Sequence, residues 1–161
     1  MNRMRGLGIL VVAGALAACS TTPATTTSPT PTAPAAATVD VTLREFAVLP
    51  SSSSALASEN PITFNATNEG PDDDHEFVVF QLIDGGDVNA LPTNDDGSVD
   101  EEGEGIALVD EVEELAPGDS ESITLTLDAG AYALVCNLVE TEGETVEVHY
   151  QLGMRASFTV A

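Results

Sequence analysis

The segment AYALVCNLVETEGETVEVHYQLGMRASFTV, residues 131–160, decides how the rest of the chain is interpreted. It opens on an apolar run that ends at Cys136, and it closes on a second run typical of a β-strand. His149 follows the cysteine by thirteen positions, and Met154 follows the histidine by five. The segment therefore places a thiol, an imidazole and a thioether, all of which bind soft or borderline metal ions, near the ends of predicted strands.

Outward from this segment, the spacing of apolar residues predicts strands through most of the chain. Apolar and polar residues alternate, or run continuously apolar between turn residues, at 39–44, 62–67, 75–82, 123–127, 132–136 and 158–160. Clusters of turn residues at 68–71 and 117–119 separate some of these runs. Apart from one possible helical turn at 109–115, no amphipathic helix is predicted. Many short strands separated by turns predict an all-β fold, an antiparallel β-sandwich.

The charge balance excludes several classes of partner. The 161 residues include 27 acidic side chains and four arginines, but no lysine. Arg3 and Arg5 lie in the first few residues and every acidic residue lies at position 40 or later, so the chain beyond its start carries 27 minus 2, or 25, net negative charges. Such a surface argues against nucleic acid, whose phosphates require Lys and Arg, and against anionic lipid. The length allows one core of ordinary size.

Residues 1–19 are predicted to be a lipoprotein signal peptide. Two arginines give a basic start, and residues 7–18 form an apolar run that is short for a membrane span of about 20 residues. The tetrapeptide Leu-Ala-Ala-Cys at 16–19 resembles the bacterial lipobox, and this resemblance implies that Cys19 becomes the lipidated first residue of the mature protein. The alternative is a plain signal peptide cleaved near Cys19. We expect an extracytoplasmic domain that its lipid anchors to the bacterial cell membrane or envelope.

Residues 20–38 are predicted to be a disordered linker. Between 21 and 37 the chain contains only Thr, Pro, Ala and Ser, which cannot build a hydrophobic core. The prolines among them stiffen the linker, and at about 3 Å per residue it could hold the domain about 50 Å from the bilayer. The domain itself is expected to span residues 39–161.

The region between 84 and 121 is strongly acidic and rich in glycine, with NDDGSVDEEGEG at 94–105 as its extreme. Its spacing partly matches a calcium-binding EF-hand loop. However, Pro92 falls where such a loop needs its first acid, and Gly103 falls where it needs the bidentate glutamate. A solvated surface loop is the favoured interpretation.

Beyond Cys19, the cysteine, histidine and methionine residues of the chain are His75, Cys136, His149 and Met154. Each has an ordinary explanation, since cysteine and methionine are common in cores and histidine is common on surfaces. Their order is more specific: a histidine opens a strand, a cysteine ends a later strand, and HYQLGM precedes the last strand. Because strand ends and loops collect at the same end of a sandwich, the four side chains could meet there.

This order resembles that of the cupredoxins, the blue copper proteins that include plastocyanin and azurin. The closing HYQLGM resembles the C-terminal copper loop of that family, and the resemblance covers about the last three quarters of the chain. It implies a Greek-key β-sandwich or barrel that binds one mononuclear type 1 copper ion through His75, Cys136, His149 and Met154. A thiolate, two imidazoles and a weak thioether are the ligands of electron-transfer copper sites.

The resemblance also implies a function. The protein would carry single electrons between redox partners, and it would not be an enzyme, because four ligands leave no evident position for a substrate. We expect a monomer whose acidic surface favours a redox partner with a basic surface. Acidic residues near the ligands also predict a low reduction potential for a site with a methionine ligand. General adaptation to high salt is the alternative explanation of the acidity.

The sequence departs from the family in two places. Twelve residues separate Cys136 from His149, where plastocyanin-like and azurin-like loops have only a few. Glu142 and Gly143, between two arms that contain valine, predict a hairpin that would return its ends to neighbouring positions. The second departure is Glu76 directly after His75, where many relatives carry an asparagine that helps to fix the thiolate ligand.

Two other functions fit the same residues. A copper-binding protein could use them to store, buffer or deliver the ion, and it would exchange copper readily without fast electron transfer. A metal-free sandwich could serve as an interaction module, with Cys136 and Met154 in its core. An oxidase or a nitrite reductase is not expected, because one ligand set provides no second copper centre.

Overall fold

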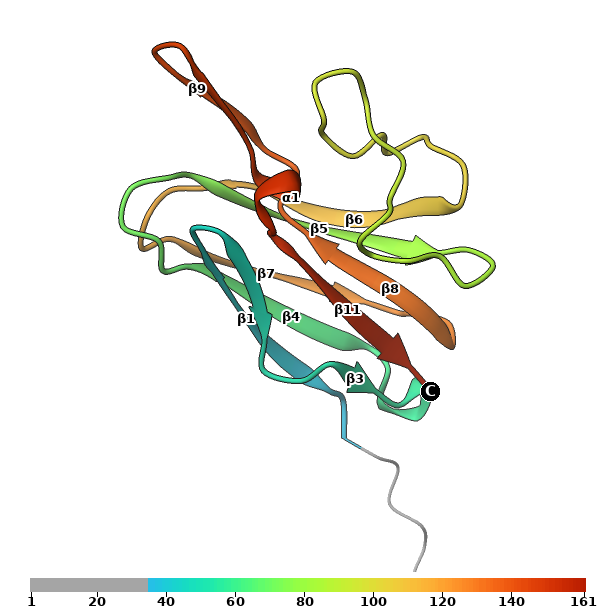
Figure 1. Cartoon of the computed structure of the whole chain (residues 1–161). Helices are drawn as coiled ribbons and strands as arrows, with labels where there is room; N and C mark the ends of the chain where they lie inside the picture. The colour runs from blue at the N-terminus through green and yellow to red at the C-terminus, as the bar shows by residue number, and fades with distance from the viewer. Residues whose placement is uncertain (1–34) are drawn as a thin grey trace, which may run out of the picture. The chain divides into compact units, whose positions relative to one another are not determined.

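The structure, a computed structural model, describes residues 35–161 (Figure 1). The predicted signal peptide, the lipobox with Cys19 and the linker up to residue 34 lie outside the described residues. In the described part of the chain, no helix has both the length and the apolar character needed to cross a membrane.

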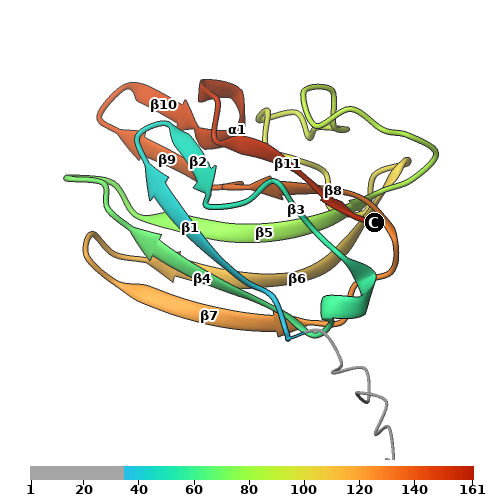
Figure 2. The same ribbon diagram turned by 90° about the horizontal axis from the view of Figure 1, so that it is seen from below.

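Two sheets face each other in a β-sandwich (Figures 1 and 2). The four-stranded sheet has the order β2 (Ala47–Pro50), β1 (Thr38–Arg44), β4 (Ile62–Asn68) and β7 (Ser120–Leu125). The five-stranded sheet has the order β3 (Ser54–Ala55), β11 (Arg155–Val160), β8 (Gly130–Val135), β5 (His75–Leu82) and β6 (Ile106–Leu115). The remaining elements are a 3₁₀-helix η1 (Ala57–Glu59), a hairpin of β9 (Val139–Glu142) and β10 (Thr145–Val148), and the single turn α1 (His149–Leu152). The predicted all-β sandwich is confirmed.

Strand pairing is mixed, although the sequence predicted antiparallel strands. Most neighbours are antiparallel, but β1 runs parallel to β4 and β3 runs parallel to β11. After β1 the chain passes through β2, β3 and η1, and the backbone N–H of Thr63 in β4 then donates to Ala37 O, beside the start of β1. This return to the starting end makes β4 run in the same direction as β1.

Strand β6 corrects the prediction for residues 109–115, where the sequence suggested one possible turn of helix. These residues belong to a ten-residue strand at the edge of the five-stranded sheet. Its pairing with β5 shifts register between His75 and Phe77 and again between Val79 and Phe80. Such bulges break the two-residue period by which a strand is recognised in a sequence.

The main core fills the space between the two sheets. Val41 and Leu43 of β1 point into it, as their alternation with polar residues predicts, and both are buried. The ring of Phe64 packs edge-on against Phe158 with the centroids 5.2 Å apart, and it lies 5.7 Å from Phe77 of the facing sheet. Aromatic contacts of this geometry add to the stability that burial of the apolar surface provides.

Strand β5 is apolar on both faces because both faces are covered. A second buried cluster lies on the side away from the main core and includes Val78, Phe80, Val88, Leu91, Val99 and Tyr150. The acidic connection between β5 and β6 supplies Val88, Leu91 and Val99, so this predicted solvated loop also packs on the sheet. The hydroxyl of Tyr150 donates to Val88 O (3.1 Å) and accepts from Leu91 N (3.0 Å), which ties the connection to α1.

Both ends of the described chain lie at one end of the sandwich, and α1 and β9 lie at the other (Figures 1 and 2). Helix η1 contacts both ends: Ala37 N donates to Glu59 O (3.0 Å), and Ala57 N donates to Ala161 O (2.7 Å). Strand β1 then leads away over seven residues, a distance of about 20 Å at the usual rise of a strand.

Candidate metal centre

Three buried donor side chains converge at the end of the sandwich that carries α1. His75 is the first residue of β5, Cys136 directly follows β8, and His149 is the first residue of α1. Nδ1 of His149 lies 3.3 Å from Sγ of Cys136 and 3.3 Å from Nδ1 of His75, and one donor atom from each residue lies within 4.8 Å of the others. All three residues are fully buried. Donor atoms this close can reach one metal ion at ordinary bond lengths of about 2.0–2.3 Å.

Met154, the fourth predicted ligand, is buried and is held next to two of these residues by its backbone. Its carbonyl oxygen accepts a hydrogen bond from Cys136 N (3.1 Å), and its N–H donates to His149 O (3.0 Å). The turn between His149 and Met154 closes at Gly153, whose φ of 121° favours glycine. The backbone thus brings Met154 to the same end of the sandwich. That all four side chains bind metal remains a prediction.

The long insertion between Cys136 and His149 folds as the predicted hairpin. Val139 of β9 lies opposite Val148 of β10, and His149 N donates to Leu138 O (3.0 Å). The turn occurs at Gly143, whose φ is 62°. The extra residues therefore project away from the sandwich, while the two ligand candidates return to neighbouring positions.

Glu76 connects the strand that carries His75 to the segment that carries Cys136. Its backbone N–H donates to Sγ of Cys136 (3.4 Å), and its side-chain Oε1 accepts from Asn137 N (2.7 Å). Burial is the largest cause that raises the pKa of this carboxyl to about 7, although the hydrogen bond from Asn137 lowers it. Glu76 thus bridges the two segments at the position where the sequence comparison with the cupredoxins had marked a departure.

Asn137 extends this network and was missed in the sequence analysis. Its Oδ1 accepts from Val99 N (2.5 Å), and its Nδ2 donates to Val99 O (3.0 Å) and to Glu101 Oε1 (3.2 Å). The position directly after the cysteine was the available signal, because a polar residue at the end of an apolar strand needs hydrogen-bond partners. Through Asn137, the acidic connection supports the segment that carries Cys136.

Burial sets the protonation of the three donor groups. It raises the pKa of the Cys136 thiol to about 12, and it lowers the pKa of His75 and of His149. Without a cation, the site therefore holds a neutral thiol and neutral imidazoles at neutral pH. A metal ion favours the thiolate, so we expect metal binding to release the thiol proton.

The two imidazole rings turn their Nδ1 atoms toward each other and their Nε2 atoms away. Nε2 of His75 and Nε2 of His149 are buried without a hydrogen-bond partner. They lie 3.8 Å from Oε1 of Glu45 and from Oε2 of Glu140, respectively. The Nδ1 atoms are thus the ones directed at Cys136. One sulfur and two imidazole nitrogens aimed at the same point fit copper better than they fit hard cations such as calcium.

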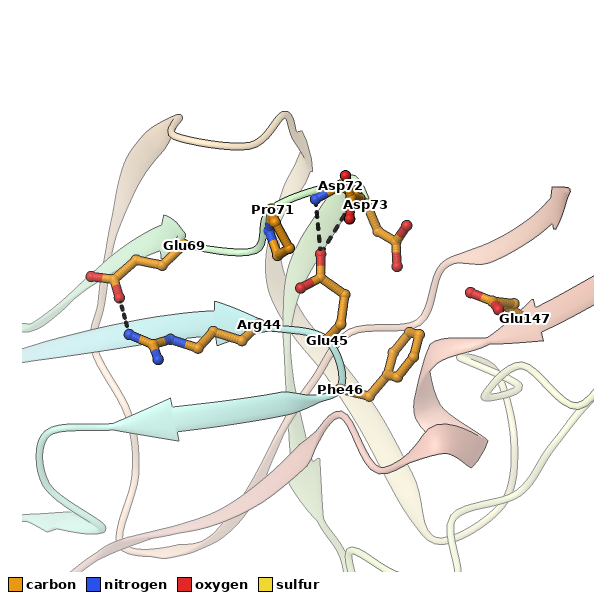
Figure 3. Close-up of a pocket in the computed structure, with 8 residues that line it drawn as sticks. All are labelled: Arg44, Glu45, Phe46, Glu69, Pro71, Asp72, Asp73 and Glu147. Atoms are coloured by element: carbon orange, nitrogen blue, oxygen red, sulfur yellow. Dashed lines mark hydrogen bonds and ion pairs between the residues drawn. The ribbon is translucent and has the colours of Figure 1, made fainter.

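A cleft of about 850 Å³ opens beside these residues (Figure 3). It is lined by Arg44, Glu45, Phe46, Glu69, Pro71, Asp72, Asp73 and Glu147. Phe46 separates it from the buried donors, since its ring packs edge-on against His149 with the centroids 5.3 Å apart. The lining contains five carboxylates and one guanidinium, that of Arg44. Arg44 forms an ion pair with Glu69.

No protein-family model matches the sequence, and no curated protein matches it. Solved structures do match. Dithionite-reduced auracyanin from the photosynthetic bacterium Roseiflexus castenholzii is 23% identical, with 80% of this chain and 99% of that chain covered at a TM-score of 0.51. Auracyanin B is 23% identical over 80% of this chain and 91% of its own (TM-score 0.48). Auracyanin A, a "blue" copper protein from Chloroflexus aurantiacus, is 16% identical over 77% and 98% (TM-score 0.47). The first likeness shows a shared fold.

Proposed function

We propose that this chain, which has the cupredoxin fold, is an extracytoplasmic blue copper protein that carries single electrons between redox partners. One observation supports the proposal above all others: Sγ of Cys136 and the Nδ1 atoms of His75 and His149 meet in a buried site at one end of the sandwich. The description of auracyanin A as a "blue" copper protein is in keeping with it.

Each side chain has a separate role in the proposed site. His75, Cys136 and His149 would hold copper through two imidazole nitrogens and a thiolate, with the thioether of Met154 as the weaker fourth ligand. Bound copper would supply the one-electron couple between Cu(I) and Cu(II). The protein keeps the donors dry and holds them in place through the bonds of Glu76, Leu138 and Met154. Donors held rigidly in this way need little rearrangement when the bound copper changes between Cu(I) and Cu(II).

Addition of Cu(II) to the purified, copper-free protein tests this function. We expect the intense blue colour of a thiolate bound to copper, at one copper per chain. A Cys136→Ser variant should remain folded by circular dichroism and should stay colourless. A folded wild-type protein that stays colourless would favour the metal-free interaction module instead.

Burial of the donors supports electron transfer over copper delivery and over catalysis. All three donor residues have no exposed surface, so an incoming chelator or substrate finds no direct access. Slow loss of copper to a chelator, with rapid electron exchange with a small redox reagent, is the result expected of a carrier. Rapid loss of copper to the chelator would support the storage or delivery protein.

Anchoring through Cys19 is part of the proposal and rests on the lipobox-like tetrapeptide at 16–19. The linker of residues 20–38 would then join the anchor to the sandwich of residues 39–161. Incorporation of labelled fatty acid into the wild-type chain, but not into a Cys19→Ser variant, is the expected result. Equal labelling of both chains would contradict the anchor and would leave the copper site untouched.

A basic protein surface is the partner that the charge distribution favours. Acidic residues surround the end of the sandwich that carries the donors, from Asp72 and Asp73 on one side to Glu140 and Glu147 on the other. Such a potential raises the rate of encounter with a basic partner, and salt reduces that rate. Electron-transfer rates to a basic cytochrome that fall as salt increases would be consistent with this partner.

A further inference from the structure

A second group of donor side chains lies on the outer side of His149. One ligand atom each from Asp73, Glu147 and His149 lies within 4.8 Å of the others. Asp73 precedes β5 and Glu147 lies in β10, so two distant segments supply the carboxylates. In Figure 3 these two carboxylates point toward each other across the cleft.

The histidine atom on this side is Nε2. Nδ1 of His149 is directed at Cys136 and His75, whereas Nε2 lies 3.8 Å from Oε2 of Glu140. Glu140 pairs directly with Glu147 across the hairpin, which places Nε2 on the side of the carboxylates. This nitrogen is fully buried and has no hydrogen-bond partner.

The buried nitrogen distinguishes this group from an ordinary acidic patch. On so acidic a chain, carboxylates come close to each other in many places without any ligand. A buried polar atom, however, almost always has a partner, and His149, whose Nε2 has no hydrogen-bond partner, is grouped with the carboxylates of Asp73 and Glu147 within 4.8 Å. A cation placed there would be a partner to all three groups at once.

We propose that Asp73, Glu147 and Nε2 of His149 form a second, outer site for a divalent transition-metal ion. Carboxylates and an imidazole are ligands suited to ions such as Mn²⁺, Fe²⁺ and Zn²⁺, and they offer nothing that favours soft Cu(I). The two carboxylates match the charge of a divalent ion. This site does not depend on the proposed copper function, because none of its contacts involves the thiol.

Sharing of His149 links the two sites. A neutral imidazole has one nitrogen with a free lone pair and one that carries a proton. A metal ion at Nε2 therefore leaves the proton on Nδ1, the atom proposed to bind copper. The outer ion binds to the copper-free protein, and copper excludes it. The exclusion by copper rests on the proposed function, whereas binding of the outer ion to the copper-free protein does not.

His75 shows why such a site forms on only one of the two rings. Its Nε2 also lies 3.8 Å from a carboxylate oxygen, Oε1 of Glu45. That oxygen already accepts from the backbone N–H groups of Asp72 (3.4 Å) and Asp73 (3.0 Å). Glu45 is thus engaged in holding the turn before β5, and among the described residues no second carboxylate is grouped with His75 as Glu147 is with His149.

Manganese is the best probe, because Mn²⁺ prefers carboxylate and imidazole ligands to a thiolate. Mn²⁺ titrated into the copper-free full chain, in moderate salt, can be followed by the loss of the electron paramagnetic resonance signal of the free ion. We expect one tight equivalent, and pulsed measurements should detect a coordinated imidazole nitrogen. Uniform weak binding without that nitrogen signal would overturn the proposal and would show diffuse attraction to an acidic surface.

Three charge-matched variants locate the ion. Asp73→Asn and Glu147→Gln should each weaken Mn²⁺ binding by at least about tenfold, since removal of even an indirect partner of a metal site has effects of that size. Glu144→Gln, at the exposed tip of the same hairpin, removes the same charge and should change the affinity less than about twofold. Equal effects in all three variants would contradict the site.

Copper provides the remaining measurement. In protein that first turns blue with Cu(II), the imidazole nitrogen signal of Mn²⁺ should be absent. A blue protein that still gives this signal would overturn the sharing of His149. A protein that binds Mn²⁺ through the imidazole but never turns blue would retain the outer site and would contradict only the proposed electron carrier.

Discussion

Glu76 holds together the two segments that carry His75 and Cys136, and it does so with a half-buried carboxyl group. Its backbone donates to the sulfur, and its side chain accepts from Asn137 N. A neutral amide in this position could accept the same bond without the cost of burying a charge. Ionisation of Glu76 must therefore weaken the fold that it supports.

We predict that Glu76 makes the copper-free protein less stable as the pH rises. Its pKa is raised from 4.5 to about 7, so the stability that its protonated form contributes is complete below about pH 4.5 and is lost as the pH rises through about 7. The shift sets a ceiling of about 3 kcal/mol on this loss. Urea unfolding at about pH 4.5 and at about pH 7 should show this loss of unfolding free energy in the wild type and a much smaller loss in Glu76→Gln.

Glu113→Gln is the matched control, because Glu113 is an exposed acid of β6. It removes one charge from the same sheet and should keep the pH dependence of the wild type. If both variants reduce the loss equally, general charge repulsion and not the Glu76 carboxyl is responsible.

The hydrogen bonds of Asn137 support a second prediction. Asn137→Ala leaves the backbone N–H of Val99 without its side-chain partner and removes the shorter of the two side-chain hydrogen bonds to its C=O. An unsatisfied buried group costs about 1–3 kcal/mol, so we expect a destabilisation of this size in chemical unfolding and faster hydrogen exchange at Val99. Asn89→Ala, which changes an exposed residue, should cost less than about 0.5 kcal/mol. Equal costs would rule out the proposed support.

The four ligand candidates were the residues of the centre that the sequence predicted best. His75, Cys136, His149 and Met154 are distinctive because the chain after residue 19 has no other cysteine, histidine or methionine. Asn137 and Glu45 were not distinctive, since asparagine and glutamate occur throughout the acidic surface. Their roles depend on which backbone N–H groups they face, and a sequence pattern does not contain that information.

At the level of elements, the β9–β10 hairpin determines how a long insertion can coexist with a compact centre. Its two strands pair from Thr145 with Glu142 to Val148 with Val139. The end nearest the sandwich carries Glu140 and Glu147, and the far end is a turn at Gly143. Of the hairpin residues, Glu147 belongs to the outer candidate site, and it lies at the near end.

We predict that the outer half of this hairpin can be removed without loss of either site. Replacement of residues 141–146 by Asn-Gly, which favours a tight two-residue turn, retains the pair of Glu140 with Glu147. Copper colour should persist, and Mn²⁺ affinity should stay within about threefold of the wild type. Loss of the blue colour in a folded variant would mean that the length of the hairpin itself positions His149.

The elements differ in how far their sequences revealed them. Strands β1 and β4 alternate cleanly because one face of each is buried and the other is not. Strand β6 was missed because two bulges interrupt its period and it lies at a sheet edge. The parallel pairing of β1 with β4 was missed for another reason: strand direction depends on the path of the connection, which leaves no local pattern.

For the molecule as a whole, charge is the dominant property. All 27 acidic residues lie within the described range, where Arg44 and Arg155 are the arginines and lysine is absent. Repulsion among so many like charges destabilises the compact state, and salt screens it.

We therefore predict that salt stabilises the protein. An increase in NaCl from about 0.05 M to about 1 M shortens the screening length to about 3 Å and should raise the midpoint of thermal unfolding by several degrees. At about pH 3, where most carboxylates are protonated, the same increase should have little effect. An equal rise at both pH values would point to a general salt effect on the core.

The same charge supports a prediction for the copper protein. Asp74 directly precedes His75, and Asp72 lies two residues before Asp74. Negative charge near the centre stabilises Cu(II) relative to Cu(I). The double variant Asp72→Asn with Asp74→Asn should raise the reduction potential by tens of millivolts, since exposed charges contribute up to about 1 kcal/mol. Titration with redox mediators measures this shift. An unchanged or lower potential would show that solvent screens these carboxylates fully.

Both ends of the described chain lie at the end of the sandwich opposite the two candidate sites. Strand β1 starts beside the carboxyl terminus, about the length of one strand away from the buried donors. If the chain is fastened to a bilayer by its first residues, its linker joins the sandwich at the end opposite the donors, and the end that carries the donors is left free of the attachment. Such a carrier could stay fixed in place while mobile partners arrive, exchange one electron and leave.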